Sequence, residues 1–273
     1  LETGGTAKCW GWNIYGQLGR GIVSTLESTP RAVLDVTGAT QLVSGFTHSC
    51  ALLPGGAVRC WGSNGNGELG TGNTIEQYRP TLVTGFSGAV TQLAAGFHHT
   101  CALESAGTVK CWGLNGTGQL GLGDTAPRLT PQTVPGLGVV TQLAAGAQTT
   151  CAIESGGTLK CWGNNFSGEL GVGDNTERRT PTLVTGFSGA VTRVVGGELH
   201  GCALESGGTV KCWGRNVEGQ LGIGTALPTV RPTQVVCPAC PAGASRAVVP
   251  AGAGTTVCVV GRTAPRTGRR RAR

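Results

Sequence analysis

The chain has 273 residues, among them 49 glycines, 12 cysteines, 6 tryptophans and no methionine. Glycine is more than twice as frequent as the roughly 7% of average proteins, which disfavours a helical fold and suits one with many tight turns. No apolar run approaches the roughly 20 residues that span a bilayer, so no membrane span is predicted. Lysine and arginine number 21 against 14 acidic residues, but the whole excess lies beyond Val236. The body of the chain is therefore neutral, and nucleic acid is not an expected partner.

The tripeptide Cys-Trp-Gly recurs along the chain at nearly equal steps. Each copy continues into a glycine-rich segment such as WGSNGNGELGTG or WGNNFSGELGVG. A fixed period of this length is the signature of a repeat architecture. We call the five copies units 1 to 5; they begin, at steps of 51, 51, 50 and 51 residues, at Cys9, Cys60, Cys111, Cys161 and Cys212.

Within a unit, the pattern predicts four short strands in chain order. In unit 4, an alternating segment at 140–146 is followed by 151–155, then by a short turn and 158–162, and finally by 180–184. The turn ends on glycine in every complete unit, as a three-residue hairpin with a left-handed residue requires. Four antiparallel strands in a period of about 51 residues, present five times, predict an all-β protein, a β-propeller of tandem four-stranded blades.

These residues also carry a family resemblance. The pattern AGxxHxCALxxxGxxxCWGxNxxGxLGxG covers about residues 1–236. It resembles the repeat of the regulator of chromosome condensation family, in a cysteine-containing, bacterial-looking form. The resemblance implies a β-propeller, usually of seven blades, that binds other proteins through loops on one face. Some members act as exchange factors for a small GTPase, and others inhibit enzymes such as β-lactamases.

Ten residues separate the two cysteines of the hairpin in each of units 2 to 5. With a three-residue turn, the two partners fall opposite each other, within disulfide range. Within-hairpin disulfides require an oxidising compartment, which predicts an extracellular, periplasmic or cell-surface protein; reduced cross-strand thiols are the alternative. The predicted pairs are Cys50–Cys60, Cys101–Cys111, Cys151–Cys161 and Cys202–Cys212. We further expect a local pair Cys237–Cys240, and a pair Cys9–Cys258 that would close a ring of five units.

The composition changes after Val236, beyond which Ala, Gly, Pro, Val and Arg dominate and no acidic residue occurs. We expect the propeller to cover residues 1–261, with 237–261 atypical, and residues 262–273 to form a basic, disordered tail; a frameshifted end is the alternative. The chain lacks a start methionine and a visible signal peptide, and Leu1 stands two residues after the place where the partner of Cys9 would lie. We therefore expect an N-terminally truncated chain.

The polar residues of the repeat are interpreted as structural. His48 and His99 each stand two residues before a cysteine, but unit 4 has Thr149 there. We therefore expect histidines that hydrogen-bond a neighbouring turn, and no metal site. Glu104 and Lys110, like their equivalents in other units, are expected to form a cross-strand surface pair. Because no catalytic spacing and no cofactor motif is present, we predict neither enzyme activity nor a cofactor.

The tryptophans of Cys-Trp-Gly, Trp10 among them, are expected to pack between blades. In contrast, the loops after the shared asparagine and after Gly-x-Gly differ from unit to unit, and propellers build binding surfaces in this way. We predict a secreted or surface-exposed scaffold that binds another protein through one face, without catalysis. The expected contacts are Tyr15, Asn66, Tyr78, Phe166, Arg178 and Arg179.

Two alternatives to this interpretation stay open. The protein could act as an exchange-factor-like regulator of a small GTPase, although the predicted disulfides disfavour a cytosolic partner, or as a propeller-type enzyme inhibitor. Tyr15 and Phe166 could fill space between blades and contact no partner.

Overall fold

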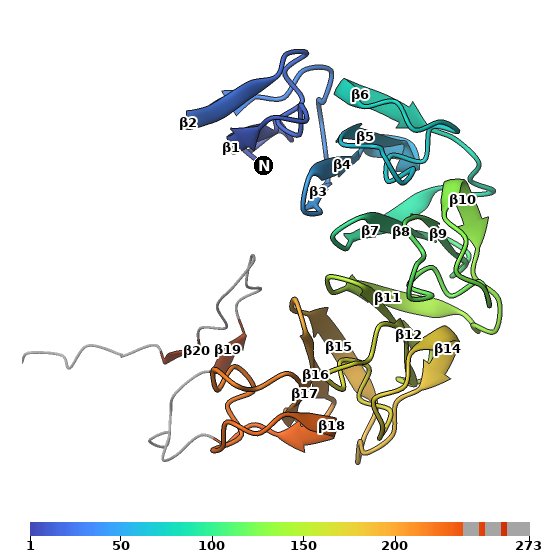
Figure 1. The fold of residues 1–273 in the computed structure, drawn as a ribbon, viewed down its shortest axis with the longest axis vertical. Helices are drawn as coiled ribbons and strands as arrows, with labels where there is room; N and C mark the ends of the chain where they lie inside the picture. The colour runs from blue at the N-terminus through green and yellow to red at the C-terminus, as the bar shows by residue number, and fades with distance from the viewer. Residues whose placement is uncertain (237–245, 249–257, 261–273) are drawn as a thin grey trace, which may run out of the picture.

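The computed structural model describes residues 1–236, 246–248 and 258–260, and the regular secondary structure of these residues is almost exclusively β-strand (Figure 1). The strands make four four-stranded antiparallel sheets and two two-stranded sheets. Blade 1 is the pair β1–β2, blades 2 to 5 are the four-stranded sheets, and the one 3₁₀ turn of the described chain is Pro54–Gly56. The predicted boundary at residue 261 and the tail beyond it lie outside the described residues.

In chain order the strands are β1 (Lys8–Asn13), β2 (Ser24–Ala32), β3 (Gln41–Ser44), β4 (His48–Leu52), β5 (Val58–Gly62), β6 (Gln77–Val83), β7 (Val90–Ala95), β8 (His99–Glu104), β9 (Val109–Gly113), β10 (Arg128–Thr133), β11 (Val140–Ala145), β12 (Thr149–Glu154), β13 (Leu159–Gly163), β14 (Arg178–Leu183), β15 (Val191–Gly196), β16 (His200–Glu205), β17 (Val210–Gly214), β18 (Thr229–Gln234), β19 (Arg246–Val248) and β20 (Cys258–Val260).

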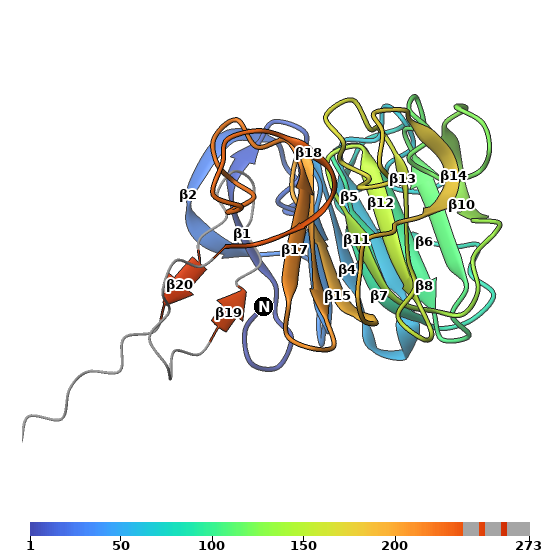
Figure 2. The same ribbon diagram turned by 90° about the horizontal axis from the view of Figure 1, so that it is seen from below.

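The blades follow one another along an open arc, with the first strand of each four-stranded blade towards the centre and the fourth at the rim (Figure 1). Because neighbouring strands are antiparallel, the first and third turns of a blade emerge on one face and the second turn on the other (Figure 2). We call these the loop face and the hairpin face. Blades 1 and 5 stand at opposite ends of the arc, so the described residues do not form the closed five-unit ring that we expected.

The hairpin register is the one expected from the ten-residue spacing. In blade 3, Cys101 lies opposite Cys111. The structure joins this pair, and the matching pair of blades 2, 4 and 5, in disulfides with a Cα–Cα distance of 4.1 Å. Cys9 is half-buried and forms no disulfide with another cysteine of the described residues; burial raises the pKa of its thiol. The side chain of Cys258 and the pair Cys237–Cys240 lie outside the described residues, so both of those pairings stay predictions.

The core between blades is built on tryptophan and glycine. Trp112 is fully buried, and its Nε1–H donates to the carbonyl of Glu68 in the preceding blade at 2.8 Å. Gly70, with φ of 70°, lies under the indole, where a Cβ would come within 2.8 Å of Nε1. The tryptophans of blades 2, 4 and 5 are buried in the same way. Trp10 is an exception to our expectation: it is 61% exposed, because no described residues pack on that side of blade 1.

The glutamate before the hairpin turn is a second correction. The expected cross-strand ion pair is present, with Lys110 Nζ 3.9 Å from Glu104 Oε1, but it does not lie on the surface. The side chain of Glu104 is 2% exposed and accepts hydrogen bonds from the backbone N–H groups of Ser87 and Gly88. Lys110 donates to the carbonyl of Gly85 at 2.6 Å. These two side chains therefore anchor the connection between blades, and Glu205 does the same in blade 5.

Candidate binding face

The shared asparagine organises each long loop of the loop face from within. Asn64 is fully buried, its Oδ1 accepts from the N–H of Leu69 at 3.0 Å, and its Nδ2 donates to the carbonyls of Asn73 and Ile75, both at 3.0 Å. Its equivalents are equally buried; they are Asn13, Asn115, Asn165 and Asn216. The loops therefore start from one common scaffold, and their exposed residues are free to differ.

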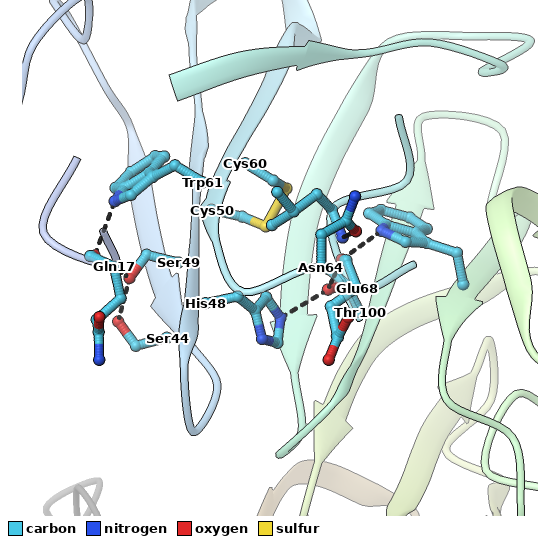
Figure 3. Close-up of a disulfide and its surroundings, with 12 residues drawn as sticks. Gln17, Ser44, His48, Ser49, Cys50, Cys60, Trp61, Asn64, Glu68 and Thr100 are labelled. Atoms are coloured by element: carbon cyan, nitrogen blue, oxygen red, sulfur yellow. Dashed lines mark hydrogen bonds between the residues drawn. A yellow bond between two sulfur atoms is a disulfide. The ribbon is translucent and has the colours of Figure 1, made fainter. Parts of the chain in front are cut away.

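A buried polar chain joins blades 2 and 3 beneath these loops (Figure 3). His48 Nε2 lies 2.9 Å from Thr100 Oγ1, which in turn donates to the carbonyl of Glu68 at 3.0 Å. Since the single hydroxyl proton of Thr100 is used there, the Nε2–H of His48 must be the donor. Burial, the largest effect, lowers the pKa of His48 to about 4, in agreement with a neutral ring. A side chain at Gly45 would collide with this imidazole.

Blades 3 and 4 repeat this arrangement through His99 and Thr150, 3.0 Å apart, and burial lowers the pKa of His99 to about 3. The histidines therefore hydrogen-bond a threonine within a strand of the neighbouring blade, and not a neighbouring turn as we expected. Among the described residues, no cluster of three or more His, Cys, Asp or Glu side chains could hold a metal ion.

Glutamine side chains tie the central strands together. Gln41 donates through Nε2 to the carbonyl of Leu93 at 2.9 Å and accepts from the N–H of Leu93 at 2.8 Å. Gln92 does the same with Leu143 in the next blade. Each side-chain amide pairs with one backbone N–H and one backbone C=O of the first strand of the next blade, groups that would otherwise lack partners on that side. These bonds hold neighbouring blades in a fixed register.

One carboxylate on the loop face is buried and balanced by a histidine. The side chain of Glu68 is 1% exposed; it accepts from His98 Nδ1 at 3.2 Å and from the backbone N–H and Nδ2 of Asn66 at 2.8 and 2.9 Å. Burial raises the pKa of Glu68, but the hydrogen bonds from His98 and Asn66 outweigh it and lower the pKa to about 2. Sequence reasoning passed over His98 because it lies outside the repeat pattern.

The equivalent carboxylate in blade 4 lacks such a partner. Glu169 is buried, and it accepts from the N–H of Ser167 at 2.7 Å and from Asn164 Nδ2 at 3.2 Å. Leu199 stands in the position that His98 has in blade 3. Burial therefore dominates, and the pKa of Glu169 is raised.

The central rim of the loop face carries an aromatic pair that the sequence analysis missed. The turns that join the first two strands of successive blades are linked by backbone hydrogen bonds, from Phe46 to Phe97 at 3.1 Å and from Phe97 to Ala147 at 2.9 Å. The two phenyl rings lie 5.2 Å apart between centroids, and Phe46 is 60% exposed. Comparing the tips of the turns between units, which read Gly-Phe, Gly-Phe, Gly-Ala and Gly-Glu, could have revealed it.

The six predicted contact residues all lie in the loops or outer strands next to the loop face, but their surroundings differ. Asn66 is engaged with Glu68, Arg178 with Asp174 at 2.6 Å, and Arg179 with Glu177 at 2.8 Å. These three side chains support the loops from which they come.

The three aromatic residues are more accessible. Tyr78 is 40% exposed and packs over Gly16, and Tyr15 is 37% exposed. Phe166 is 78% exposed, so it does not fill space between blades. It forms one wall of an open groove of about 520 Å³ at the junction of blades 4 and 5. The groove is lined by Phe166, Ser167, Asn175, Arg215, Val217, Pro228 and Val230.

The fold and this face define a class of protein, a tandem-repeat β-propeller with a rigid frame and variable loops. The sequence profile of the RCC1-like domain matches residues 1–265, and the chain belongs to this family. No helix in the described part of the chain is long and apolar enough to cross a membrane.

Individual relatives agree with the family assignment. The chain is 34% identical over 243 residues to the ultraviolet-B receptor UVR8 of Arabidopsis thaliana, covering 87% of this chain and 55% of the receptor. It is 35% identical over 129 residues to the probable E3 ubiquitin-protein ligase HERC4 of Homo sapiens, covering 46% of this chain and 12% of the ligase. The chain therefore spans about half the length of the receptor and far less of the ligase.

Among solved structures, Prp20p of Saccharomyces cerevisiae, described with its binding properties to Gsp1p and histones, is similar with a TM-score of 0.80. It is 26% identical, and the match covers 95% of this chain and 66% of Prp20p. Human WBSCR16 is similar with a TM-score of 0.74 and 27% identity, covering 82% and 61% of the two chains.

Proposed function

We propose that this protein is a scaffold that binds another protein through the loop face and performs no catalysis itself. The observation that supports this most is the contrast between a buried, repeated frame and exposed loops that differ in every blade. Phe46 and Phe166 are large apolar side chains held on that face at 60% and 78% exposure. Aromatic side chains of this kind dominate the energetics of protein interfaces.

We further propose that the protein works in an oxidising compartment, at the cell surface or outside the cytoplasm. Four disulfides in a chain of this size support that location, because cytosolic thiols are kept reduced. The similarity to Prp20p favours a second candidate, a regulator of a small GTPase. The disulfides favour the first.

Binding through the loop face can be tested with a matched pair of variants. The double variant Phe46→Ala, Phe166→Ala alters the loop face, and Val139→Ala alters an equally exposed apolar residue, at 57%, in the connection between blades on the hairpin face. Proteins captured from the extracellular fraction of the source organism would be quantified by mass spectrometry. We expect at least one protein to be retained by the wild type and the control and lost by the double variant. Equal retention by all three would contradict the proposal.

The location can be tested through the thiols. Protein exported to a bacterial periplasm and protein kept in the cytoplasm would be alkylated under denaturing conditions without reductant. We expect all eight cysteines of the four hairpins to be blocked in the exported protein and reactive in the other. Reactive thiols at these positions in exported protein would contradict an oxidising location.

A further inference from the structure

The groove between blades 4 and 5 exists because two apolar side chains face each other across one junction. Phe166 and Val217 occupy the same repeat position in neighbouring blades and are 78% and 56% exposed. At the three other junctions of the described arc, at least one residue of the equivalent pair is Gly65 or Gly116. Glycine supplies no wall, so only this junction has both sides built up.

The floor and rim of the groove combine apolar and polar groups. Pro228 and Val230 also line the groove, and Val230 packs on Gly168, where an added Cβ would come within 2.9 Å of the Cα of Val230. Asn175 donates to the carbonyl of Phe166 at 2.9 Å and thereby fixes the wall. The groove volume of about 520 Å³ falls in the range of roughly 300–1,000 Å³ that ligand sites occupy.

The charged side chain that lines the groove is an arginine. Arg215 lines it, in a position that is Ser63, Leu114 or Asn164 in blades 2 to 4. Arg215 pairs with Glu218 at 2.6 Å through Nη2, while its side chain stays 41% exposed, which leaves donors of the guanidinium available.

A second arginine lies beside the groove. In blades 3 and 4, Asp124 and Asp174 each pair with an arginine four residues on, but blade 5 has Thr225 and Thr229 in these two places and lacks the whole ion pair. Arg231 lays its guanidinium over Gly173 of the adjoining loop and has no ion pair within the described residues. A ligand with carboxylates therefore matches this junction better than one with cationic groups.

We propose that this groove docks an extended acidic peptide segment of a partner protein, with one large apolar side chain seated between Phe166 and Val217. The carboxylates on either side of that side chain are bound by Arg215 and Arg231, in the charge-assisted hydrogen bonds that arginine forms well. This inference rests on the proposed function, because it specifies which part of the loop face recognises the partner and by what chemistry.

The test uses peptides of defined composition as probes. Short peptides with Leu, Phe or Trp at the centre would be flanked by acidic, by amide or by lysine residues, and binding to the full chain would be measured by fluorescence anisotropy. We expect the acidic set to bind and the lysine set not to bind. The double variant Phe166→Ala, Val217→Ala should weaken binding at least about tenfold. Arg215→Gln should weaken it less, and high salt should mimic that loss because it screens exposed charges.

Ile75→Ala is the matched control, since Ile75 is 66% exposed in a loop of the same face at another blade. It should change binding less than twofold. Acidic peptides that bind equally to the groove variants would overturn the groove while leaving a loop-face scaffold in place. If the amide or lysine peptides bind better than the acidic ones and lose affinity in the groove variants, the proposal of an acidic ligand is wrong. If no peptide binds, the groove proposal fails, and the capture experiment with the Phe46 and Phe166 variant decides the scaffold separately.

Discussion

The junction between blades 2 and 3 and the junction between blades 4 and 5 share one frame and differ in the histidine bond, in the surroundings of the buried carboxylate and in the exposed loop residues. In both, a buried tryptophan donates to a loop carbonyl of the preceding blade, Trp112 at 2.8 Å and Trp213 at 2.7 Å. The first junction adds the His48–Thr100 bond at 2.9 Å. At the second junction, Thr149 stands in the place of the histidine and Gly201 in the place of the threonine, and the ring of Trp213 fills the space over Gly201.

The buried carboxylates of the two junctions also differ in their partners. Glu68 at the first junction is balanced by His98, whereas Glu169 at the second faces no such group and has a raised pKa. The first junction also has glycine at both wall positions, whereas the second has the groove. The comparison teaches that the indole–carbonyl contact and the glycine beneath it define a junction, while the histidine, the carboxylate and the exposed loop residues can change independently.

The largest expected loss of stability concerns the buried tryptophan that both junctions share. Trp112→Ala and Trp213→Ala should each lower the free energy of unfolding by about 3–5 kcal/mol, because they open a large cavity and remove a buried hydrogen bond. Trp10→Ala, the exposed equivalent, should change it by less than about 0.5 kcal/mol. Denaturant unfolding measures all three. A comparable loss for Trp10→Ala would show that the Trp10 indole is covered and contributes to the packing.

The second prediction addresses the polar chain that only the first junction has. Thr100→Val keeps the shape of the side chain but leaves the Nε2–H of His48 without an acceptor. We expect a loss of about 1–3 kcal/mol, the usual effect of an unsatisfied buried donor. Thr149→Val is the control at the second junction, since the Thr149 hydroxyl makes no hydrogen bond within the described residues. Equal losses of stability for the two substitutions would show that the His48–Thr100 hydrogen bond does not distinguish the first junction from the second.

The third prediction separates the two carboxylates by pH. The pKa of Glu68 is about 2 in the folded protein against an ordinary value of 4.5, so its ionised form stabilises the fold above about pH 4.5, and this contribution is lost as the pH falls towards 2. Glu68→Gln should therefore destabilise by about 1–3 kcal/mol at pH 7, through loss of charge-assisted bonds, and by much less near pH 2.

For Glu169 the effect of pH on stability has the opposite direction. Because its folded pKa is raised, the stability associated with the protonated form is present at low pH and lost as the pH rises through that pKa. Glu169→Gln should therefore stabilise the protein at pH 7, by about 0.5–2 kcal/mol, and the gain should disappear in acid. Gln119 occupies this position in blade 3, so the amide fits the frame. Unfolding curves across pH that shift in the same direction for both variants would refute the contrast.

The smallest expected effect is on the groove wall. Phe166→Ala should leave the free energy of unfolding unchanged within about 0.5 kcal/mol, because the ring is 78% exposed. Leu170→Ala, four residues on and fully buried, should lower it by about 2–5 kcal/mol. A clear drop in melting temperature for Phe166→Ala would place the ring in the packing of the blades and leave the groove without its wall.

The sequence by itself determined the features that depend on spacing within one unit. The period, the hairpin register and the opposition of Cys101 to Cys111 follow from a turn of fixed length, and the side-chain period of two residues along a strand admits only one pairing. The burial of the tryptophans of blades 2 to 5 was equally predictable, because the same apolar residue recurs where a blade must cover its neighbour.

Only the tertiary structure decided which residues meet across a junction. His98 and Glu68 are thirty residues apart, Phe166 and Val217 belong to different blades, and Glu104 reaches a connection seventeen residues away. No local pattern encodes such contacts, since each depends on the angle at which one rigid blade is set against the next. For the same reason Trp10 and Trp112 share a motif yet differ completely in burial: what covers an indole is the neighbouring blade and not its own sequence.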